Sequence, residues 1–369
     1  MLTITLAAAL VAPQLITPPT APRAAEPAVA WFEGTWPEAV ALAEREDRPL
    51  FIEFWRPGCG WCKQLEEETF PAPAVRSELE DFVCFEVSSE SPEGLELAKT
   101  FNLQALPAMF FLNSEAQLED VIFGYMAPAD LAVELQRVKR GEETFTALEA
   151  RVAADPKDLD AHFALANKKW ALGDSEGYYH HVHIIEAADP ELRSLPMRRM
   201  VLGGLQEELY GCRYVDGVLD PTRILEFLAA EQHEELLFDG WSYLARVQAQ
   251  EKNAPASAQA FREAWGHVPA LLVGRFGHEI GWTLWPLRAD LAAEDAQFVL
   301  EVAKRAYASF EEQGGGTDAA RADYLDVLAC AHHMSGDRAK AIELGERSLA
   351  LAPDRRDIRT RLSQFKLGR

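Results

Sequence analysis

Two cysteines separated by two residues, Cys59 and Cys62, constrain the fold of this chain more than any other feature of its sequence. The run before them, residues 50–55, is apolar and rich in aromatic residues, which predicts a buried strand. The segment after them, residues 63–70, has the pattern of a helix. A Cys-x-x-Cys turn between a strand and a helix is typical of a redox site, provided that the surrounding elements agree.

The elements predicted around this turn alternate between helices and strands. Pro71 and Pro73 interrupt the helix that follows the cysteines. The predicted helices cover residues 36–47, 63–70, 75–79, 93–101 and 128–140. The predicted strands cover residues 50–55, 82–87, 108–112 and 121–125. This order within about 110 residues predicts a three-layer α/β domain.

Length and charge narrow the possible classes of function. With 369 residues the chain is long enough for two domains with sizeable cores. Its composition, 48% hydrophobic and 26% charged, is that of a globular protein. The formal net charge of −23 argues against nucleic acid or an anionic membrane as a partner, because both attract basic patches.

Residues 1–30 have the composition of a targeting segment. Residues 2–16 are almost wholly apolar, but this run is shorter than the roughly 20 residues that span a bilayer. Ala28-Val29-Ala30 fits the pattern before a signal-peptide cleavage site, which would make Trp31 the first mature residue. We therefore expect an exported protein, periplasmic or extracellular. A disordered leader on a cytoplasmic protein stays open, because no Lys or Arg precedes the apolar run.

Four short motifs along residues 31–141 stand in the order that characterises one family. They are Glu53-Phe54-Trp55 at a strand end, Cys59-Gly60-Trp61-Cys62-Lys63, Leu106-Pro107, and Gly124 on the last strand. Together they resemble the thioredoxin family, and the Glu-rich helix after the cysteines most resembles its periplasmic branch. The resemblance implies a three-layer α/β fold, thiol-disulfide exchange with protein substrates, an electron donor or acceptor protein, and no other cofactor.

The cysteine turn has the residues that thiol-disulfide exchange requires. A helix start lowers the pKa of Cys59 through unpaired N–H groups and the helix dipole, so we expect Cys59 to attack. Cys62, one turn later on the same face, would be the buried resolving thiol. Glu53 lies on an apolar strand, where burial would raise its pKa toward the working range. By resemblance it is the family's buried acid and takes the proton of Cys62; a solvent-facing acid is the alternative.

Two further positions are expected to contact substrate. A cis Leu106-Pro107 bond would expose the Leu106 backbone to an extended substrate strand, whereas a trans proline at a strand start is the alternative. Trp61 would cover the thiol, contact substrate or pack beside the turn. Gly58 and Trp61 depart from the commonest version of the turn in the family. The direction of electron flow therefore stays open, although we favour a reductase over an oxidase or isomerase.

Other roles for the cysteines and histidines are less consistent with the sequence. A purely structural disulfide is disfavoured, because closing so short a loop removes little chain entropy. A zinc site needs four ligands and no second Cys-x-x-Cys exists; the histidine cluster at 180–183 fits a solvated or packed helix face better. We expect no metal. Cys84 and Cys330 have the pattern of core residues, whereas Cys212 is unassigned and could pair with Cys330 in an exported protein.

The remaining residues, 142–369, lack strand signals and have helical patterns almost throughout. Two segments share the spacing Ala-x6-Gly-x16-Pro, and a third has Lys252 in place of the glycine. The positions are Ala166, Gly173 and Pro190; Ala329, Gly336 and Pro353; and Ala245 and Pro269. This pattern resembles the tetratricopeptide repeat (TPR), whose paired antiparallel helices pack through small residues. We expect an all-α, TPR-like solenoid that binds a protein partner; residues 197–210, 223–228 and 295–310 also look helical.

Two functions from different classes follow. In the first, the protein is an exported thiol-disulfide oxidoreductase acting on protein disulfides, and its helical domain positions partners. In the second, it is an interaction protein whose repeats bind a partner and whose thioredoxin-like domain is a docking module without significant redox activity. A depressed thiol pKa at Cys59, with turnover of a disulfide substrate, would distinguish the first from the second.

Overall fold

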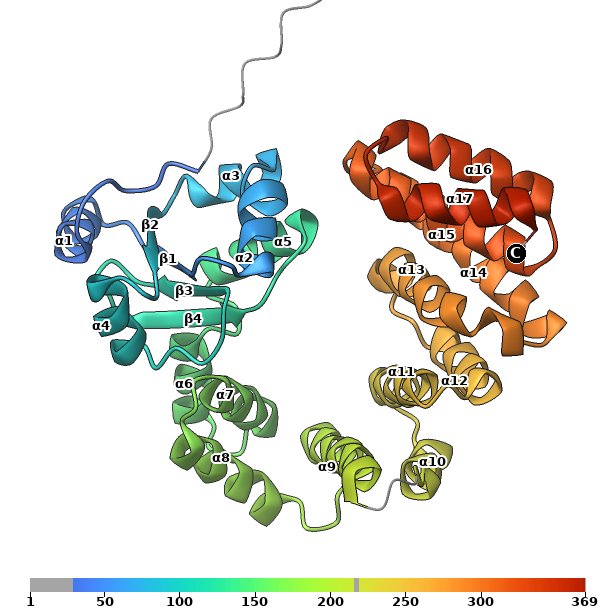
Figure 1. The fold of residues 1–369 in the computed structure, drawn as a ribbon. Coiled ribbons are helices and arrows are strands. Elements are labelled where there is room, and N and C mark those ends of the chain that lie inside the picture. The colour runs from blue at the N-terminus through green and yellow to red at the C-terminus, as the bar shows by residue number, and fades with distance from the viewer. Residues whose placement is uncertain (1–28, 216–218, 369) are drawn as a thin grey trace, which may run out of the picture. The chain divides into compact units, whose positions relative to one another are not determined.

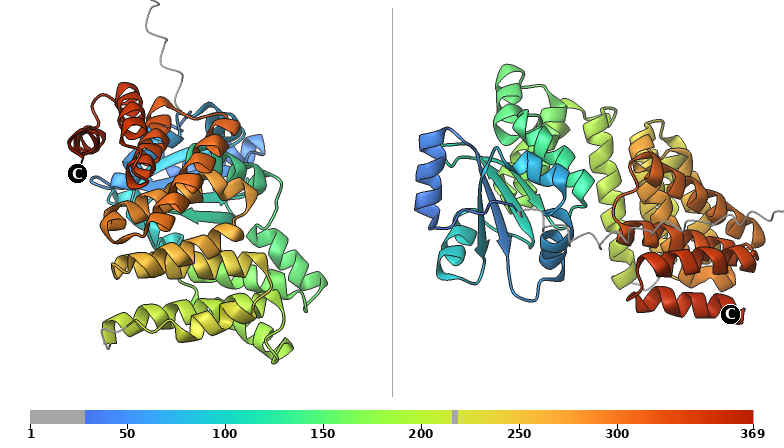
Figure 2. Two further views of the ribbon diagram at one scale, coloured as in Figure 1. Left: turned by 90° about the vertical axis from the view of Figure 1, so that its right-hand side faces the viewer. Right: turned by 90° about the horizontal axis from the view of Figure 1, so that it is seen from above.

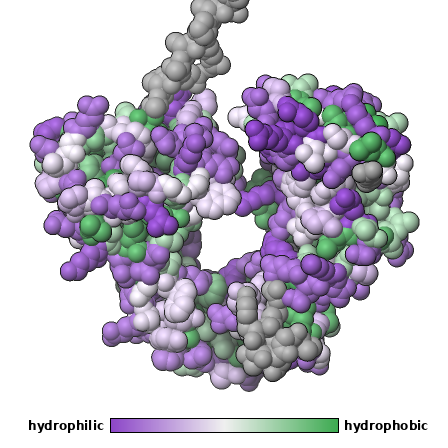
Figure 3. All heavy atoms as spheres, viewed as in Figure 1, coloured by the Kyte–Doolittle hydropathy of each residue, from purple (hydrophilic) through white to green (hydrophobic). Residues whose placement is uncertain are grey.

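The computed structural model describes residues 29–215 and 219–368, so most of the leader expected at 1–30 lies outside the described residues. The chain divides into two compact units, one ending at Ala188 and the other beginning at Asp189. Among the described helices, none is both long and apolar enough to cross a bilayer. The face seen in Figure 3 carries mainly hydrophilic side chains, as the net charge of −23 leads us to expect.

The first unit is built on a four-stranded sheet in the order β2-β1-β3-β4. The strands are β1 (Leu50–Trp55), β2 (Val83–Ser88), β3 (Ala108–Leu112) and β4 (Leu118–Phe123). β1 runs parallel to β2 and antiparallel to β3, and β3 and β4 form an antiparallel pair. The apolar runs in the sequence become the two central strands, because both faces of those strands are buried.

Helices cover both faces of the sheet and confirm the three-layer α/β prediction (Figure 1). One face packs against α2 (Gly60–Gln64), α3 (Pro73–Leu79) and α5 (Pro128–Lys139). The other packs against α1 (Trp36–Glu46) and α4 (Pro92–Thr100). Alternate residues of β1 enter the two cores: Phe51 faces the first layer and Ile52 faces the second. The right-hand view of Figure 2 shows the sheet between these layers.

Two predicted boundaries differ from the structure in informative ways. The helix after the cysteines starts at Gly60 rather than Lys63, and then continues as one π-helical turn, η1 (Leu65–Thr69). β4 begins at Leu118 rather than Val121, because the Asn113 side chain closes the preceding turn tightly. Its Oδ1 accepts hydrogen bonds from two backbone N–H groups, those of residues 115 and 117, at 3.0 and 2.9 Å.

The three helices that follow α5 belong to the same compact unit as the sheet. They are α6 (Phe145–Ala154), α7 (Leu159–Ala171) and α8 (Ser175–Ala188). Phe145 and Leu148 pack in one cluster with Leu118 and Val121 of β4. The buried Asp120 of β4 pairs with Arg137 of α5 and Lys168 of α7. The boundary expected after residue 141 therefore does not coincide with the boundary between the two compact units.

The second unit is helical throughout its described residues, as expected. Its α-helices are α9 (Leu195–Val215), α10 (Thr222–Ala230), α11 (Glu234–Gln250), α12 (Ala254–Gly266), α13 (Val273–Leu284), α14 (Ala293–Glu312), α15 (Asp318–Met334), α16 (Arg338–Leu351) and α17 (Arg356–Leu367). Two short 3-10 segments, η2 (Ala270–Leu272) and η3 (Trp285–Asp290), lie on either side of α13. Neighbouring helices share one continuous apolar core.

The repeated spacing found in the sequence marks three helical hairpins, α7–α8, α11–α12 and α15–α16. The residue at the glycine position has a positive φ in each: 69° at Gly173, 59° at Lys252 and 89° at Gly336. Lys252 therefore adopts the left-handed conformation that glycine adopts in the other two hairpins. The small residues at the helix contacts are buried, namely Ala166, Ala245, Ala264, Ala329 and Ala341.

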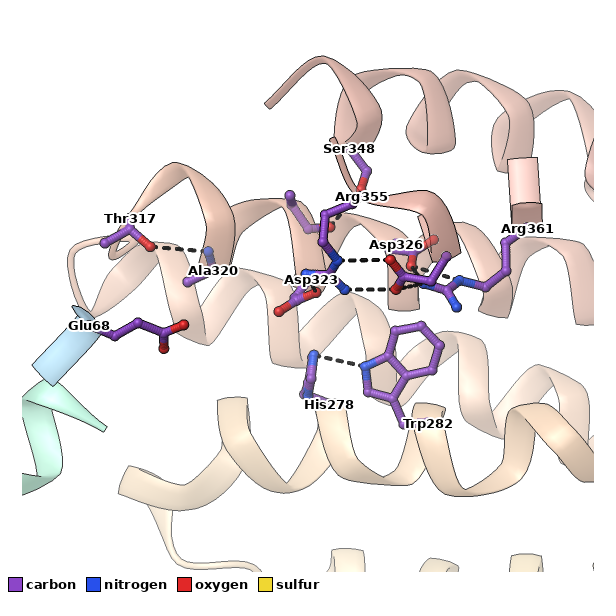
Figure 4. A network of polar contacts seen from close by, with 12 residues as sticks. Glu68, His278, Trp282, Thr317, Ala320, Asp323, Asp326, Ser348, Arg355 and Arg361 are labelled. Atoms are coloured by element: carbon purple, nitrogen blue, oxygen red, sulfur yellow. Dashed lines mark hydrogen bonds and ion pairs between the residues drawn. The ribbon is translucent and has the colours of Figure 1, made fainter. Parts of the chain in front are cut away.

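A polar network stabilises the C-terminal end of this core (Figure 4). Asp323 pairs with Arg355 at 2.9 Å, and the fully buried Asp326 pairs with Arg361. Trp282 donates its indole N–H to His278 at 3.2 Å. The guanidinium of Arg361 also lies over the Trp282 ring of α13, 4.5 Å from its centroid, so that α13, α15 and α17 are connected. The pairing with Arg361 neutralises the Asp326 carboxylate, which would otherwise be costly to bury.

Candidate active site

The two cysteines of the turn lie where strand β1 passes into a helix. Cys59 is the N-cap of α2, with φ −77° and ψ 103°, and its sulfur accepts a hydrogen bond from the Cys62 N–H at 3.2 Å. A disulfide joins the two residues, whose Cα atoms are 5.3 Å apart. Cys59 is partly exposed, whereas Cys62 is only 6% exposed. The outer sulfur is therefore the one that a partner molecule can reach.

A cavity of about 700 Å³ opens beside this disulfide. Cys59 and Cys62 form part of its wall, and the aromatic side chains of Trp31 and Phe70 form another part. Three glutamates also line it: Glu53 from β1, Glu66 from η1 and Glu86 from β2. The disulfide and a buried carboxyl thus share one solvent-connected space, and the burial of Glu53 agrees with the expectation from the sequence.

Glu53 is buried among apolar side chains, with an exposed fraction of 4%. It lies on the central strand between Glu86 of β2 and Met109 of β3. No described residue donates a hydrogen bond to its carboxyl in the structure. Burial raises the pKa of Glu53 to about 8, and the negative charges of Glu86 and Glu66 add to this effect. The solvent-facing alternative for Glu53 is therefore wrong.

The other two glutamates of the cavity were not predicted. Burial raises the pKa of Glu86, and the charge of Glu66 raises it further. Glu86 sits on a strand whose other residues are mostly buried, which is the same signal that pointed to Glu53. Glu86 could have been found from the sequence by pairing the predicted strands 50–55 and 82–87 in parallel register, which places it beside Glu53. Glu66 looked like one more solvated acid in a Glu-rich helix, and only the three-dimensional arrangement brings it to the cavity.

The Leu106-Pro107 peptide bond is cis, as predicted. Pro107 is buried, and its carbonyl accepts a hydrogen bond from the Gly124 N–H at 2.8 Å. Leu106 is partly exposed. Gly124 has a φ of 89°, a conformation that favours glycine, which explains this residue type at the end of β4. The structure thus connects the two motifs through one backbone hydrogen bond.

Trp61, between the cysteines, projects outward and is 60% exposed. One side of its ring packs on Tyr125, with ring centroids 5.6 Å apart and planes tilted by 34°. The Tyr125 hydroxyl donates to Glu68 Oε2 at 3.2 Å, and Gln64 donates to the same oxygen at 3.0 Å. Trp61 therefore forms an exposed apolar surface beside the disulfide, supported from behind by Tyr125.

The remaining described cysteines are buried free thiols. Burial raises the pKa of Cys84 to about 12, and it raises the pKa of Cys330 well above the ordinary value. Both predictions of core cysteines are confirmed. The structure does not contain the Cys212–Cys330 pairing that the sequence left open, and the Cys212 side chain lies outside the described residues.

The histidine cluster on α8 does not form a metal site. His180 and His183 are exposed, and no group of metal-binding side chains occurs within residues 29–215 and 219–368. His181 is buried against His162 of α7, with their Nδ1 atoms 2.8 Å apart, a contact for which the sequence has no local signal. Burial and the neighbouring His162 lower the pKa of His181 to about 4. The His181 ring is thus a neutral part of the α7–α8 contact.

The comparisons with known proteins each cover a part of this chain. Residues 36–139 match the family model of a thioredoxin-like domain. The thiol:disulfide interchange protein DsbD of Klebsiella pneumoniae is 30% identical over 100 residues, which are 26% of this chain and 17% of that protein. The DsbD of Vibrio cholerae is 31% identical over 81 residues, 21% of this chain and 14% of that protein.

Solved structures also match a part of the chain. A thioredoxin from Thermus thermophilus shares 31% identity over 30% of this chain and 88% of its own, with a TM-score of 0.28. The chain spans less than a fifth of the length of the two curated relatives that it matches.

Proposed function

Because residues 36–139 form a thioredoxin-like domain, we propose that the protein is a thiol-disulfide oxidoreductase that acts on protein disulfides. One observation carries this proposal: the Cys59–Cys62 disulfide opens into the same cavity as the buried carboxyl of Glu53. A purely structural disulfide would need neither an accessible sulfur nor a proton acceptor with a pKa near neutrality.

Cys59 is the attacking residue in this proposal. In the reduced protein it lies at the start of the helical segment from Gly60 to Thr69, where unpaired N–H groups favour the thiolate. The Cys59 thiolate attacks a substrate disulfide, forms a mixed disulfide and releases one substrate thiolate. Cys62 then attacks the Cys59 sulfur, which releases the second substrate thiolate and restores the Cys59–Cys62 disulfide. Two electrons pass from the dithiol to the substrate.

Glu53 moves the proton of Cys62 in this scheme. The buried Cys62 thiol must lose its proton before it can attack the mixed disulfide. A carboxyl with a pKa of about 8 can accept that proton and return it near neutral pH. Both residues line the same cavity, which supports this role for Glu53.

Leu106 and Trp61 are the proposed substrate contacts. The partly exposed backbone at Leu106, next to the cis bond, can pair with an extended substrate segment. The exposed Trp61 ring supplies apolar contact area close to the disulfide. A macromolecular substrate can approach the partly exposed Cys59 sulfur more easily than the buried Cys62 sulfur.

We propose that the protein works as a reductase, so that electrons pass from its dithiol to the substrate disulfide. The reduction potential of the Cys59–Cys62 couple tests this choice. A value near about −270 mV supports a reductase, whereas a value near about −120 mV identifies an oxidant. The measurement is a redox titration against glutathione at a fixed pH.

The helical hairpins are proposed to be TPR-like and to bind a protein partner. Their left-handed turns and buried alanines support this proposal. We also propose export, on the basis of the apolar run at 2–16 and the Ala28-Val29-Ala30 sequence. N-terminal sequencing of the mature protein would then begin at Trp31.

Trapping of the mixed disulfide tests the proposed reaction. A Cys62→Ser variant lacks the resolving thiol, so a protein substrate should stay covalently attached through Cys59. A Cys62→Ser/Cys59→Ser double variant is the matched control and should trap nothing. Equal amounts of trapped substrate in both variants would rule out Cys59 as the attacking residue.

A further inference from the structure

Glu86 lies next to Glu53 in the sheet. The two residues are register partners on the parallel strands β1 and β2, where neighbouring strands are about 4.8 Å apart and paired side chains point to the same face. That face is the one covered by α2, η1 and α3, on which the disulfide lies. Two carboxyls are thus held side by side below the redox pair.

Glu86 also lines two cavities, not one. It forms part of the wall of the active-site cavity, together with Glu53 and Cys62. It also lines a second open cavity of about 700 Å³, between the outer edge of β2 and the segment around Trp31. Glu53 lines only the first of these cavities. Glu86 is exposed, whereas Glu53 is buried. The two carboxyls therefore form a continuous polar path from the interior to solvent.

The charges around the pair favour a shared proton. Glu66 of η1 is a third carboxyl on the same cavity and disfavours ionisation of both partners. Arg56 and Lys63 are the cations that line the cavity, and Lys63 is already paired with Glu67. On the β3 side, Glu53 faces the uncharged Met109. Two adjacent carboxyls with no cation between them cannot both ionise easily, so one proton stays on the pair.

We propose that Glu86 acts through Glu53 as the outer member of a proton-sharing carboxyl pair, which carries the Cys62 proton between the active-site cavity and solvent. The inference rests on the proposed exchange reaction. When Cys62 attacks the mixed disulfide, its proton passes to Glu53, then to Glu86, and from Glu86 to water in the second cavity. Reduction of the Cys59–Cys62 disulfide takes up the proton by the reverse route.

The test compares three single variants of the full-length protein. Glu86→Gln removes the second carboxyl and keeps its size, while Glu86→Asp keeps the charge. Glu90→Gln is the matched control, because Glu90 is an exposed acid just after β2 that lines neither cavity. Two quantities are measured: the titration midpoint of the Glu53 carboxyl by carbon NMR in the oxidised protein, and the pH profile of protein-disulfide reduction.

We expect Glu86→Gln to lower the Glu53 midpoint by about one pH unit and to move the pH profile in the same direction. Glu86→Asp should restore most of both shifts, and Glu90→Gln should change neither. A Glu53 midpoint that is the same in Glu86→Gln as in the wild type overturns the proposal, as does an equal shift in Glu90→Gln. A shifted midpoint in a protein without any exchange activity supports the carboxyl pair but overturns the exchange reaction and the route for its proton.

Discussion

At the scale of single residues, burial separates the groups that can react from those that cannot. Cys59 is partly exposed at a helix start, whereas Cys84 and Cys330 lie in apolar cores that raise their thiol pKa values. The same effect acts on Glu53, whose carboxyl is buried without a hydrogen-bond donor from any described residue. A buried acid of this kind costs stability, which is consistent with a role in chemistry rather than in folding.

The cost of burying Glu53 should appear as a pH dependence of stability. Its pKa rises from 4.5 to about 8 on folding, so the folded state binds the proton more tightly than the unfolded state. The protein should therefore lose stability as the pH rises between these values, in contrast to the usual behaviour of carboxylates. At about 1.4 kcal/mol per pH unit, the loss reaches roughly 3–5 kcal/mol above pH 8.

A Glu53→Gln variant isolates this contribution. The free energy of unfolding is measured by urea denaturation of the oxidised proteins between pH 5 and 9. We expect the variant to be more stable than the wild type at high pH, by an amount that shrinks towards zero at about pH 5. A difference between the two proteins that stays constant with pH would show that Glu53 ionises normally in the folded state.

At the scale of elements, much of the first unit could be predicted because its strands are short apolar runs between clear turn signals. The bounds of β1 and β3 agree with the predicted ones, since both strands are buried on both faces. The beginning of β4 was missed because two acids, Glu119 and Asp120, follow Leu118, and such a run resembles a loop. The π-helical turn η1 has no sequence signal, since it depends on packing under Tyr125 and Met126.

The site was predicted residue by residue where local motifs exist, and missed where it depends on pairing between strands. Cys59, Cys62 and Glu53 follow from one continuous stretch of sequence. Glu86 reaches the same cavity only through the register of β1 with β2, which lies more than thirty residues away. A single sequence does not contain this register directly, because it is set by the packing of both strands between two helical layers.

The hairpin turns allow a test of the repeat geometry. Lys252 has a φ of 59°, where a side chain costs about 1 kcal/mol relative to glycine. We expect Lys252→Gly to raise the free energy of unfolding by roughly 0.5–1 kcal/mol.

The matched variant is Gly336→Ala, at φ 89°, where an added Cβ meets no atom within 4 Å. The alanine differs from the glycine here only by its backbone strain. We therefore expect the free energy of unfolding, measured by heat or urea, to fall by about 1 kcal/mol. A destabilising Lys252→Gly would show that the α11–α12 turn does not share the conformation of the other two.

At the scale of the whole molecule, the chain has two compact units whose boundary does not fall where the strands end. The buried Asp120 holds α7 to the sheet through Lys168, and Phe145 covers the apolar side of β4. The helices α6–α8 thus complete the thioredoxin-like unit as well as beginning the helical region. In the second unit, the buried Asp326 is compensated by its pairing with Arg361.

Truncation at two positions tests this view of the boundary. A chain ending at Ala188 should fold cooperatively, because it keeps the whole first unit. A chain ending at Gly141 loses Lys168 and exposes Leu118 and Val121, so we expect it to be at least about 3 kcal/mol less stable. Thermal unfolding of the two fragments makes the comparison. Equal stabilities would place the boundary at residue 141 instead.

The account as a whole stands on Cys59 as the attacking sulfur of a thiol-disulfide oxidoreductase. Its most direct test is the rate at which the full-length protein reduces a disulfide-bonded protein, with dithiothreitol as the electron source. We predict that Cys59→Ser lowers this rate to that of dithiothreitol alone, while Cys84→Ser, which alters a buried thiol, keeps the wild-type rate. Wild-type turnover in Cys59→Ser, or no turnover in the wild type, would contradict the account.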